Sequence, residues 1–556
     1  MLSTRDLAAM GRTSYDLLVI GGGITGACIA RDAALRGMSE ALVERQDFSH
    51  ATSAATSKLV HGGLRYLKSL EFSLVHESLV ERQFWLSMAP HMVAPLPFLI
   101  PTWGVGAHNS LFIRAGLTLY DFMSRGHRET SDPHSVIPPH QAFSKKTALQ
   151  MAPVLEDTPL SSAALYYDCQ TYAPERLGLE CILDAKANGA AIANYAHVTG
   201  LLRQGDTITG AEVEDKLGSE RTKIKAAVTV NAAGPWADLL LDTLGSSPHA
   251  RLIRSKGLHL ITRSLNDTQA MMVPTNGTHF FVIPWRGHSI IGPTDTPHNQ
   301  APEAVCVSDE DIEELLRTIN KGLPHAHLTR KDVVRTYVGL RPLIDTSDPE
   351  AEKKDAGTYR ASRKAEVYDH EKTHDGLHVS GLISAMGGKW TTSRHVAEQV
   401  VDMAYAKLNR EAPPCLTRQT PTYGGHVGRF AEFITAMTRQ NPHIPPAQLT
   451  HLARLYGSRL EEVLALDTDG MAPLGRHVFD CAAQITYALR FEMAQTLMDV
   501  LFRRTACTAL THPGNAVIER AADIMGDALG WSTQEKTHQI NTVHDAMALN
   551  HMVCKN

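Results

Sequence analysis

A strand, a glycine-rich turn and a helix follow one another near the N-terminus, and this order constrains the fold more than any other feature. The apolar run Tyr15–Ile20 leads into Gly21-x-Gly23-x-x-Gly26, and a helical pattern covers about Thr25 to Arg36. A second strand, Ala41–Glu44, ends on an acidic residue about eighteen positions after the last glycine. Glycines let a backbone approach a pyrophosphate, the helix N-terminus supplies amide donors, and the acid suits a ribose hydroxyl. The sequence therefore predicts a dinucleotide-binding βαβ unit.

A second glycine turn lies near residue 390. The segment Met386–Thr392 has the pattern of a strand, a glycine turn and a helix start. At a helix start, Gly388 and Lys389 would bring amide hydrogens and charge to the N1–C2=O edge of a flavin, where negative charge forms on reduction. Two such turns far apart in the sequence indicate one cofactor held from both ends, and Thr391 belongs to the same predicted site.

The segment that follows the first unit is rich in hydroxyl groups. Thr52, Ser53 and Ser57 suit the pyrophosphate and ribityl chain of FAD, and His61-Gly62-Gly63 permits close approach to an isoalloxazine ring. The alternative is a solvated Ser/Thr loop. Together with the two glycine turns, this segment favours non-covalently bound FAD over NAD.

Composition excludes several other classes of protein. The 54 basic and 59 acidic residues give a net charge of −5, which argues against a nucleic-acid partner. The eight cysteines form no Cys-x-x-Cys and no His-Glu-x-x-His occurs, so we expect no metal site and free thiols in a reducing compartment. There is no secretory signal and no run of roughly 20 apolar residues, which predicts a cytoplasmic chain with contact at a membrane surface still open.

The pattern of elements changes along the chain. Proline-interrupted apolar runs between about 90 and 160 suggest an insertion over the cofactor, and residues 250–345 are rich in predicted antiparallel strands. After Pro413-Pro414 the chain is mostly helical. The strongest predicted helix, Ala482–Arg504, has apolar residues at four-residue spacing that we assign to a core: Ile485, Leu489, Met493, Leu497 and Leu501.

Several of these segments together resemble one family, the FAD-dependent, quinone-linked glycerol-3-phosphate dehydrogenases. The resemblance extends over about residues 15–400 in family order, and the helical 430–530 region resembles the family's C-terminal cap. The matching segments are Ser57–Leu67, Asn231–Trp236, Phe281–Trp285, Ile291–Asp295 and Gly387–Thr392. Ser393 stands where the family pattern has a tyrosine, which puts the role of that hydroxyl in doubt.

The resemblance implies an α/β fold, with a glutathione-reductase-type Rossmann FAD domain, an antiparallel substrate sheet and a C-terminal helical domain. The FAD-dependent oxidoreductase region is expected at 1–410 and the helical cap at 411–556. Within the first region, the FAD-binding parts are expected at about 13–90, 175–245 and 375–410, and the substrate-binding parts at about 91–174 and 246–374.

The resemblance also implies a reaction, in which sn-glycerol 3-phosphate is oxidised at C2 to dihydroxyacetone phosphate, FAD is reduced and a quinone takes the electrons at the inner face of the cytoplasmic membrane. The phosphate requires cations, and Arg65, Arg341 and Lys389 stand in matching motifs, with Tyr66 as a hydrogen-bond donor. His259 is the expected base and Arg341 would stabilise the alkoxide. Further cofactor contacts are expected from Val198 at the adenine, and from Gly234 and Trp236.

Other functions remain open at this point. Within the same fold, the chain could be a glycerol-3-phosphate oxidase that uses oxygen, or an FAD oxidoreductase of an amine or hydroxy acid. From a different class, it could be a nucleotide-binding regulatory protein without turnover. The sequence leaves open whether the chain forms a homodimer.

Overall fold

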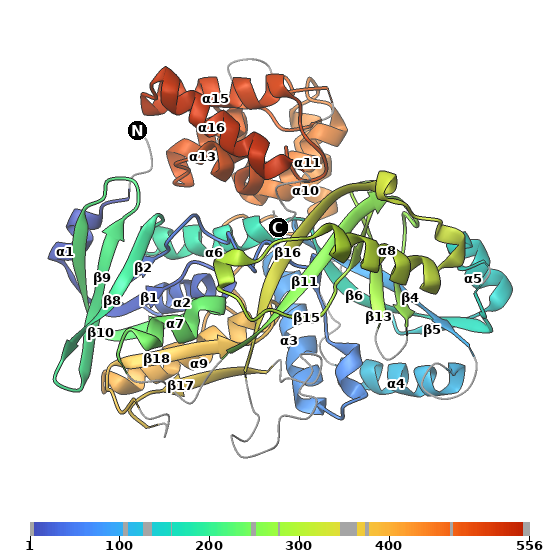
Figure 1. The fold of residues 1–556 in the computed structure, drawn as a ribbon, viewed down its shortest axis with the longest axis horizontal. Coiled ribbons are helices and arrows are strands. Elements are labelled where there is room, and N and C mark those ends of the chain that lie inside the picture. Colours follow the sequence, from blue (N-terminus) through green and yellow to red (C-terminus); the bar gives the residue numbers. More distant parts are fainter. Residues whose placement is uncertain are drawn as a thin grey trace.

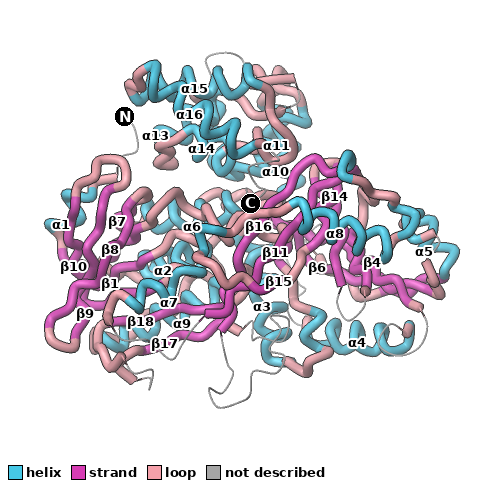
Figure 2. Tube along the Cα trace, viewed as in Figure 1, coloured by secondary structure: helices cyan, strands magenta, loops and turns pink. Residues whose placement is uncertain are grey.

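The computed structural model describes residues 5–103, 109–125, 136–156, 158–245, 252–275, 279–344, 364–372, 377–466, 471–476 and 478–548. In these residues, two sheets lie side by side and a block of helices from the last part of the chain lies over them (Figure 1). Figure 2 shows the strands gathered in the two lower parts of the molecule and the helices α10–α16 above them.

The first sheet contains eight strands within the described residues, and its centre is parallel with the order β18-β10-β1-β2-β7. These strands are β1 (Ser14–Ile20), β2 (Glu40–Val43), β7 (Ala191–Ala193), β10 (Arg221–Asn231) and β18 (Leu382–Gly387). Strands β17 (Ala365–Asp369), β8 (Ala196–Gln204) and β9 (Thr207–Asp215) join through antiparallel pairs. This order places β1 between two parallel neighbours, which explains why Leu17–Ile20 are apolar and buried without alternation.

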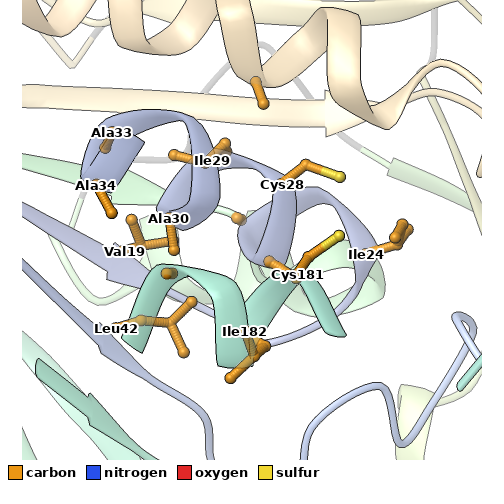
Figure 3. Close-up of a cluster of buried hydrophobic side chains, with 14 of the residues drawn as sticks. Val19, Ile24, Cys28, Ile29, Ala30, Ala33, Ala34, Leu42, Cys181 and Ile182 are labelled. Atoms are coloured by element: carbon orange, nitrogen blue, oxygen red, sulfur yellow. The ribbon is translucent and has the colours of Figure 1, made fainter. Parts of the chain in front are cut away.

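Helices cover this parallel sheet. Helix α2 (Ile24–Leu35) packs against α6 (Pro174–Ala187) and α9 (Ser393–Lys407), while α1 (Leu7–Arg12) and α7 (Ala237–Asp242) are short. The small residues Ala30, Ala33 and Ala34 allow α2 to lie close to its neighbours, and Figure 3 shows Cys28 of α2 beside Cys181 of α6. The close packing holds the start of α2 against the end of β1.

The second sheet contains ten strands within the described residues, and all its pairs are antiparallel except β12–β4. Its order is β15-β11-β14-β13-β12-β4-β6-β3, with β16 beside β11 and β5 beside β6. The bounds are β3 Leu59–Val60, β4 Val93–Thr102, β5 Gln141–Ser144, β6 Ser162–Thr171, β11 Leu252–Arg263, β12 Ala270–Pro274, β13 His279–Trp285, β14 His288–Gly292, β15 Thr296–Pro297 and β16 Val333–Ile344.

The helices of the second sheet belong to two hydrophobic clusters. Helix α8 (Asp309–Gly322) shares one with β12 and β13, and α5 (Lys145–Met151) contributes to it. Helices α3 (Phe72–Met88) and α4 (Ser110–Met123) share another with Phe98 and Tyr166. No helix among the described residues is both long and apolar enough to cross a membrane.

The C-terminal helical part follows a segment that runs back along the first sheet's helices. Arg31 of α2 donates hydrogen bonds to the carbonyls of Thr420 and Pro421, and Arg36 donates to that of Pro413. The expected boundary between residues 410 and 411 falls at the start of this segment and stays a prediction. The helices beyond it are α10 Phe430–Gln440, α11 Pro446–Tyr456, α12 Leu460–Leu464, α13 Ala482–Phe491, α14 Leu497–Asp499, the π-helical turn Val500–Arg504, α15 Asn515–Leu529 and α16 Thr533–Met547.

The predicted fold class is confirmed, but some local predictions are wrong. Residues 90–160 contribute β5 and β4 to the second sheet, and their placement over the cofactor stays a prediction. The sequence analysis did not identify β4 as a strand. Pro95, Pro97 and Pro101 obscured this strand, since proline removes donors from a ladder; β4 nevertheless pairs with β6 along its whole length and with β12 only at Phe98 and Leu99.

The helix predicted over 482–504 is interrupted. Its apolar residues are all buried as expected, but α13 ends at Phe491 and Met493 has a φ of +57°, a left-handed conformation that no continuous helix accommodates. The expectation of free thiols is confirmed at Cys28, Cys169, Cys181, Cys415, Cys481 and Cys507. It is wrong at Cys306, which is disulfide-bonded.

Candidate active site

A single cavity of about 960 Å³ joins the two glycine turns and extends between the two sheets. Most of the predicted cofactor residues line it, namely Gly21, Gly23, Glu44, Thr52, Ser53, Ser57, His61, Gly63, Val198, Gly234, Trp236, Gly388, Lys389 and Thr391. The predicted substrate residues Arg65, Tyr66, His259 and Arg341 line the same cavity. Gly26 and Gly62 lie behind its wall.

The first turn has the close contacts that require glycine. Gly21 has a φ of +113°, and a Cβ on Gly26 would lie 1.9 Å from the carbonyl oxygen of Gly21. The amide of Ile24, the first residue of α2, donates to Ser53 Oγ at 2.8 Å. Only backbone fits between the end of β1 and the start of α2, so the amides of this turn can approach a ligand in the cavity.

Glu44 stands at the end of β2 beside this turn. Its two carboxylate oxygens accept hydrogen bonds from the amides of Gly22 at 2.7 Å and Gln46 at 2.9 Å. Burial raises the pKa of Glu44, and these two amide bonds oppose the rise. The side chain is therefore fixed in position at the cavity wall.

Trp236 lines one side of the cavity, and there it contacts Arg45 and Glu303, two residues that the sequence analysis did not identify. The guanidinium carbon of Arg45 lies 3.9 Å from the centre of the Trp236 ring, and the indole Nε1 donates to Glu303 Oε1 at 2.5 Å. Arg45 also pairs with Glu303 at 2.8 Å. Glu303 is distant in the sequence and belongs to no motif, so only the fold reveals this link.

The second turn differs from the prediction in one respect. Gly387 and Gly388 both have positive φ, at +70° and +90°, and helix α9 begins only at Ser393. The prediction that Gly388 and Lys389 lie at a helix start is therefore wrong, because two consecutive left-handed residues cannot begin a right-handed helix. Ser393 lines the cavity and its hydroxyl donates to the carbonyl of Lys389 at 3.2 Å.

The second turn is joined directly to the His61-Gly62-Gly63 segment. The amide of His61 donates to Thr391 Oγ1 at 3.2 Å, and the indole of Trp85 donates to the Thr391 carbonyl at 2.9 Å. The amide of Gly62 donates to Asp168 Oδ1 at 2.9 Å. The two segments that the sequence analysis placed near a flavin ring thus form one continuous wall.

The cations gather where these segments meet. Arg65 donates to Tyr66 Oη at 3.0 Å, and the Lys389 ammonium lies 4.2 Å from the centre of the Tyr66 ring. Arg341 donates to Ser255 Oγ at 3.0 Å and to the carbonyl of Thr294 at 2.9 Å. Burial, with the nearby charge of Arg65, lowers the pKa of Lys389 to about 7. This end of the cavity is built to receive an anion.

Three histidines lie among these cations, and of these His259 is buried while His61 and His279 are partly exposed. Burial and the charges of Arg341 and Lys58 hold the pKa of His259 well below its usual 6.5. Burial and neighbouring cations lower the pKa of His61 to about 3 and that of His279 to about 4. At neutral pH all three imidazoles are therefore uncharged and can accept a proton.

His259 is held by two contacts. Its Nε2 lies 2.8 Å from Ser57 Oγ, and its ring stacks on Tyr337 with centroids 4.8 Å apart. Its Nδ1 is buried and has no hydrogen-bond partner among the described residues. Among the described residues, Ser57 is therefore the hydrogen-bond partner of the imidazole, and it lies at Nε2.

Comparison with known proteins decides the family. Residues 16–403 match the family model of FAD dependent oxidoreductases, and residues 415–536 match that of the C-terminal domain of alpha-glycerophosphate oxidase. The chain is 36% identical to the glycerol-3-phosphate dehydrogenase of Synechocystis sp., with 98% of each chain covered. It is 34% identical to the aerobic glycerol-3-phosphate dehydrogenase of Bacillus subtilis, covering 98% of this chain and 97% of that protein.

The chain belongs to the FAD-dependent glycerol-3-phosphate dehydrogenase family. The glycerol-3-phosphate dehydrogenase of Bacillus halodurans, solved in complex with FAD, superposes with a TM-score of 0.77 at 29% identity and covers 99% of this chain and 98% of that chain. An FAD-bound L-alpha-glycerophosphate oxidase from Mycoplasma pneumoniae shares the fold, with a TM-score of 0.53 at 17% identity over 73% of this chain and 98% of the other.

FAD is the cofactor of this glycerol-3-phosphate dehydrogenase family member, and the cavity fits it. The cavity extends from the first glycine turn, where only backbone fits, to the second glycine turn, where Gly387 and Gly388 have positive φ. A Cβ on Gly62 would lie 2.2 Å from Tyr120 Oη, so the backbone between these turns also has no room for a side chain. No cluster of three or more His, Cys, Asp or Glu residues that could hold a metal ion occurs among the described residues.

The sequence analysis did not identify the residues that hold the backbone of Gly62 in place. Asp168 Oδ1 accepts hydrogen bonds from the Gly62 amide, from Arg82 at 2.8 Å and from Tyr120 Oη at 2.8 Å. Asp168 and Arg82 are buried, and they come from β6 and α3. An isolated aspartate in a strand carries little signal, although a charged residue in an otherwise apolar strand can indicate a buried partner.

Proposed function

We propose that this chain oxidises sn-glycerol 3-phosphate at C2 to dihydroxyacetone phosphate, with FAD as first electron acceptor and a quinone as second. The observation that carries the proposal is the meeting of Arg65, Arg341 and Lys389 at one end of the cofactor cavity. A phosphate monoester carries close to two negative charges near neutral pH, which such groups bind through charge-assisted hydrogen bonds. The names of the Synechocystis and Bacillus relatives support the same substrate.

Arg341 and Arg65 bind the anionic substrate, together with Lys389 and the hydroxyl of Tyr66. Arg341 is fixed by Ser255 and Thr294, so its guanidinium is already oriented before substrate arrives. The same cation stabilises the negative charge that develops on the C2 oxygen when its proton leaves. Arg341 is thus both a binding and a catalytic residue in this proposal.

His259 accepts the proton of the C2 hydroxyl. Because Nδ1 is buried, the proton arrives at Nε2, beside or through the hydroxyl of Ser57. Burial lowers the pKa of His259 most, and the charges of Arg341 and Lys58 lower it further. A bound phosphate would neutralise Arg341, so substrate binding raises the basicity of the imidazole. His61 and His279 remain neutral at the same end of the cavity.

The remaining predicted residues hold the cofactor. Glu44 receives the ribose hydroxyls, the amides of Gly21 and Gly23 with Ser53 receive the pyrophosphate, and Val198 receives the adenine. Thr52, Ser57, Gly63, Gly234, Trp236 and Thr391 line the rest of the FAD site, with Gly26 and Gly62 as its backbone support. Bound FAD supplies a hydride acceptor for C2. Gly388 and Lys389 place positive charge at the edge of the ring system that becomes negative.

The proposed contact with the membrane and the quinone lies at a surface that we call the α4 face. On α4, Leu111, Phe112 and Phe122 have 76%, 55% and 62% of their side chains exposed. Phe72 of α3, which packs against α4, and the nearby Leu70 are also exposed. Lys68, Arg114 and Arg125 flank these residues, and apolar side chains with basic neighbours suit an anionic lipid surface.

We propose that the α4 face contacts the inner face of the cytoplasmic membrane, where a quinone is available. Tyr120 of the same helix donates to Asp168, whose carboxylate holds Gly62 at the cavity wall, so the α4 face is one helix away from the site. Assembly as a homodimer also stays a prediction.

The test is anaerobic mixing of the purified holoprotein with sn-glycerol 3-phosphate, glycerol, an amine and a hydroxy acid. Loss of the visible flavin absorbance with sn-glycerol 3-phosphate alone is the expected result. Faster reoxidation by a soluble quinone analogue than by oxygen supports the dehydrogenase, whereas rapid peroxide release supports an oxidase. A colourless protein that binds NAD would refute both.

A further inference from the structure

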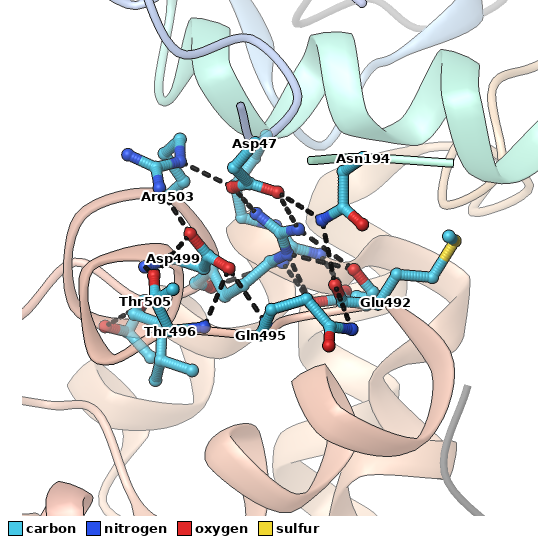
Figure 4. Close-up of polar contacts among 12 residues, drawn as sticks. Asp47, Asn194, Glu492, Gln495, Thr496, Asp499, Arg503 and Thr505 are labelled. Carbon is cyan, nitrogen blue, oxygen red and sulfur yellow. Dashed lines mark hydrogen bonds and ion pairs between the residues drawn. The ribbon is translucent and has the colours of Figure 1, made fainter. Parts of the chain in front are cut away.

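The interruption of the helix predicted over 482–504 places a polar cluster against the segment that follows Glu44 (Figure 4). The chain leaves α13 at Phe491, turns at Met493 and re-forms a helix at Leu497 that ends in the π-helical turn Val500–Arg504. Such turns are rare and often occur at functional positions. Here the turn directs two consecutive arginines at one carboxylate.

That carboxylate belongs to Asp47, which is fully buried. Arg503 Nε donates to its Oδ2 at 2.5 Å, and Arg504 donates to Oδ2 at 2.6 Å and to Oδ1 at 2.8 Å. Asn194 Nδ2 contacts both Asp47 Oδ1 at 3.1 Å and the carbonyl of Met493 at 3.0 Å. Although burial opposes ionisation, the charges of Arg504 and Arg503 hold the pKa of Asp47 well below its usual range.

Asp47 lies in the middle of a segment that contributes to the cofactor cavity at both ends. Glu44 and Ser53 line the cavity and accept hydrogen bonds from the amides of Gly22 and Ile24. Between them, the amide of Ser49 donates to the carbonyl of Gly22 at 2.9 Å. Asp47 itself does not line the cavity, and among the described residues its side chain contacts the C-terminal helical part and Asn194.

We propose that Arg503 and Arg504 are positioning residues for the cofactor. Acting through Asp47, they hold the segment 44–53 in the conformation that receives FAD. The C-terminal helical part is then a component of the cofactor site, although none of its described residues lines the cavity.

A second contact between the helical part and the rest of the chain provides a matched control. Arg454 of α11 donates to the carbonyl of His91 at 3.2 Å, so it anchors the same helical part to the rest of the chain. Neither residue lines the cavity or belongs to the segment 44–53. Losing this contact loosens the same interface without touching Asp47, Arg503 or Arg504.

The experiment measures the affinity of the full-length apoprotein for FAD by fluorescence titration, alongside its melting temperature. Asp47→Asn and Arg504→Lys should raise the Kd for FAD about tenfold or more, because a buried charged hydrogen bond is broken. Arg454→Lys should leave the Kd for FAD within about twofold, even if it lowers the melting temperature as much as Arg504→Lys does. An equal rise in Kd for Arg454→Lys, or an unchanged Kd for Arg504→Lys, would overturn the proposal. If Asp47→Asn does not fold, the Kd values of Arg503→Lys and Arg504→Lys for FAD test the proposal.

A reciprocal measurement uses the wild-type protein. If the cluster couples the cofactor segment to the helical part, binding of FAD must in turn stabilise that part. Hydrogen exchange of the amides in 497–505 should slow on addition of FAD to the apoprotein, and this slowing should be lost in Arg504→Lys. Exchange in 497–505 that is the same with and without FAD contradicts the proposal whatever the enzymatic activity.

Discussion

The ammonium of Lys389 lies 4.2 Å from the centre of the Tyr66 ring and also donates to Ser78 Oγ at 2.6 Å. These contacts join the second glycine turn to the segment that carries Arg65. They also take the ammonium out of bulk water, which is why the pKa of Lys389 is about 7 instead of 10.5. A binding cation with this pKa makes substrate affinity depend on pH.

The first prediction concerns this dependence. Lys389 is charged below pH 7 and loses its proton as the pH rises through that value, while a phosphate monoester has already lost its second proton near about pH 6. The KM for sn-glycerol 3-phosphate should therefore rise above pH 7. Lys389→Arg should abolish the rise because arginine stays charged. A wild-type KM that is flat from neutral to alkaline pH contradicts the assignment.

Arg341→Ala should raise the KM about 10- to 100-fold, as expected for the loss of a charge-assisted hydrogen bond. The flavin content, measured from the visible absorbance per protein, should stay unchanged. Arg263→Ala is the control, since Arg263 lies on the neighbouring strand β11 and pairs with Asp332 outside the cavity. Normal kinetics for Arg341→Ala would rule out a role in binding phosphate or stabilising the alkoxide.

His259→Gln should lower kcat by about 10²- to 10⁴-fold, the range for loss of a general base, with little change in KM. Ser57→Ala should lower kcat less, because water can replace the hydroxyl beside Nε2. Stopped-flow measurement of anaerobic flavin reduction isolates this step from reoxidation. A rate of flavin reduction equal to that of the wild type would remove His259 as the base.

Gly26→Ala should give a protein that no longer retains FAD. The added Cβ would lie 1.9 Å from the Gly21 carbonyl, which forces the start of α2 away from β1. Gly116→Ala in α4 is the matched control, because a Cβ there meets nothing within 4 Å and alanine favours a helix by about 0.5–1 kcal/mol. Retention of FAD is read from the absorbance spectrum after gel filtration. Full retention by Gly26→Ala would contradict the close packing at this turn.

The α4 face predicts binding to lipid. Vesicles that contain an anionic phospholipid should co-sediment with the wild-type protein, and the double variant Phe112→Ser, Phe122→Ser should lose most of this binding. Leu217→Ser, at a residue 47% exposed in the turn between β9 and β10, should bind as the wild type does. Flavin reduction by substrate should be the same in all three proteins. Equal sedimentation of all three would assign the membrane contact elsewhere.

Local sequence predicted the nucleotide end of the site well. Helix α2 begins at Ile24 and β2 ends at Val43, each within one residue of its expected position, because glycine spacing and apolar runs act over short distances. The gathering of Arg65, Arg341 and Lys389 was predicted only through a resemblance. No local rule brings three positions so far apart in the chain to one cavity.

The parts that escaped prediction depend on contacts between distant segments. The spacing from Ile485 to Leu501 satisfies a continuous helix, and all five apolar residues are buried. After the interruption Arg503 and Arg504 pair with Asp47, more than four hundred residues earlier, and a local pattern carries no information on such a contact. Helix α8 was also missed, although Ser308 and Asp311 form a capping box at its start, which is a readable signal.

The strand order of the first sheet has a consequence for how the holoenzyme is made. β1 leaves the ribosome early, but its parallel neighbour β10 is more than two hundred residues away and β18 lies at residues 382–387. Since domains fold as units during synthesis, the nucleotide-binding motif has no complete sheet until about two thirds of the chain has emerged. FAD is therefore incorporated late, and truncated chains that carry the intact N-terminal motif should accumulate without cofactor.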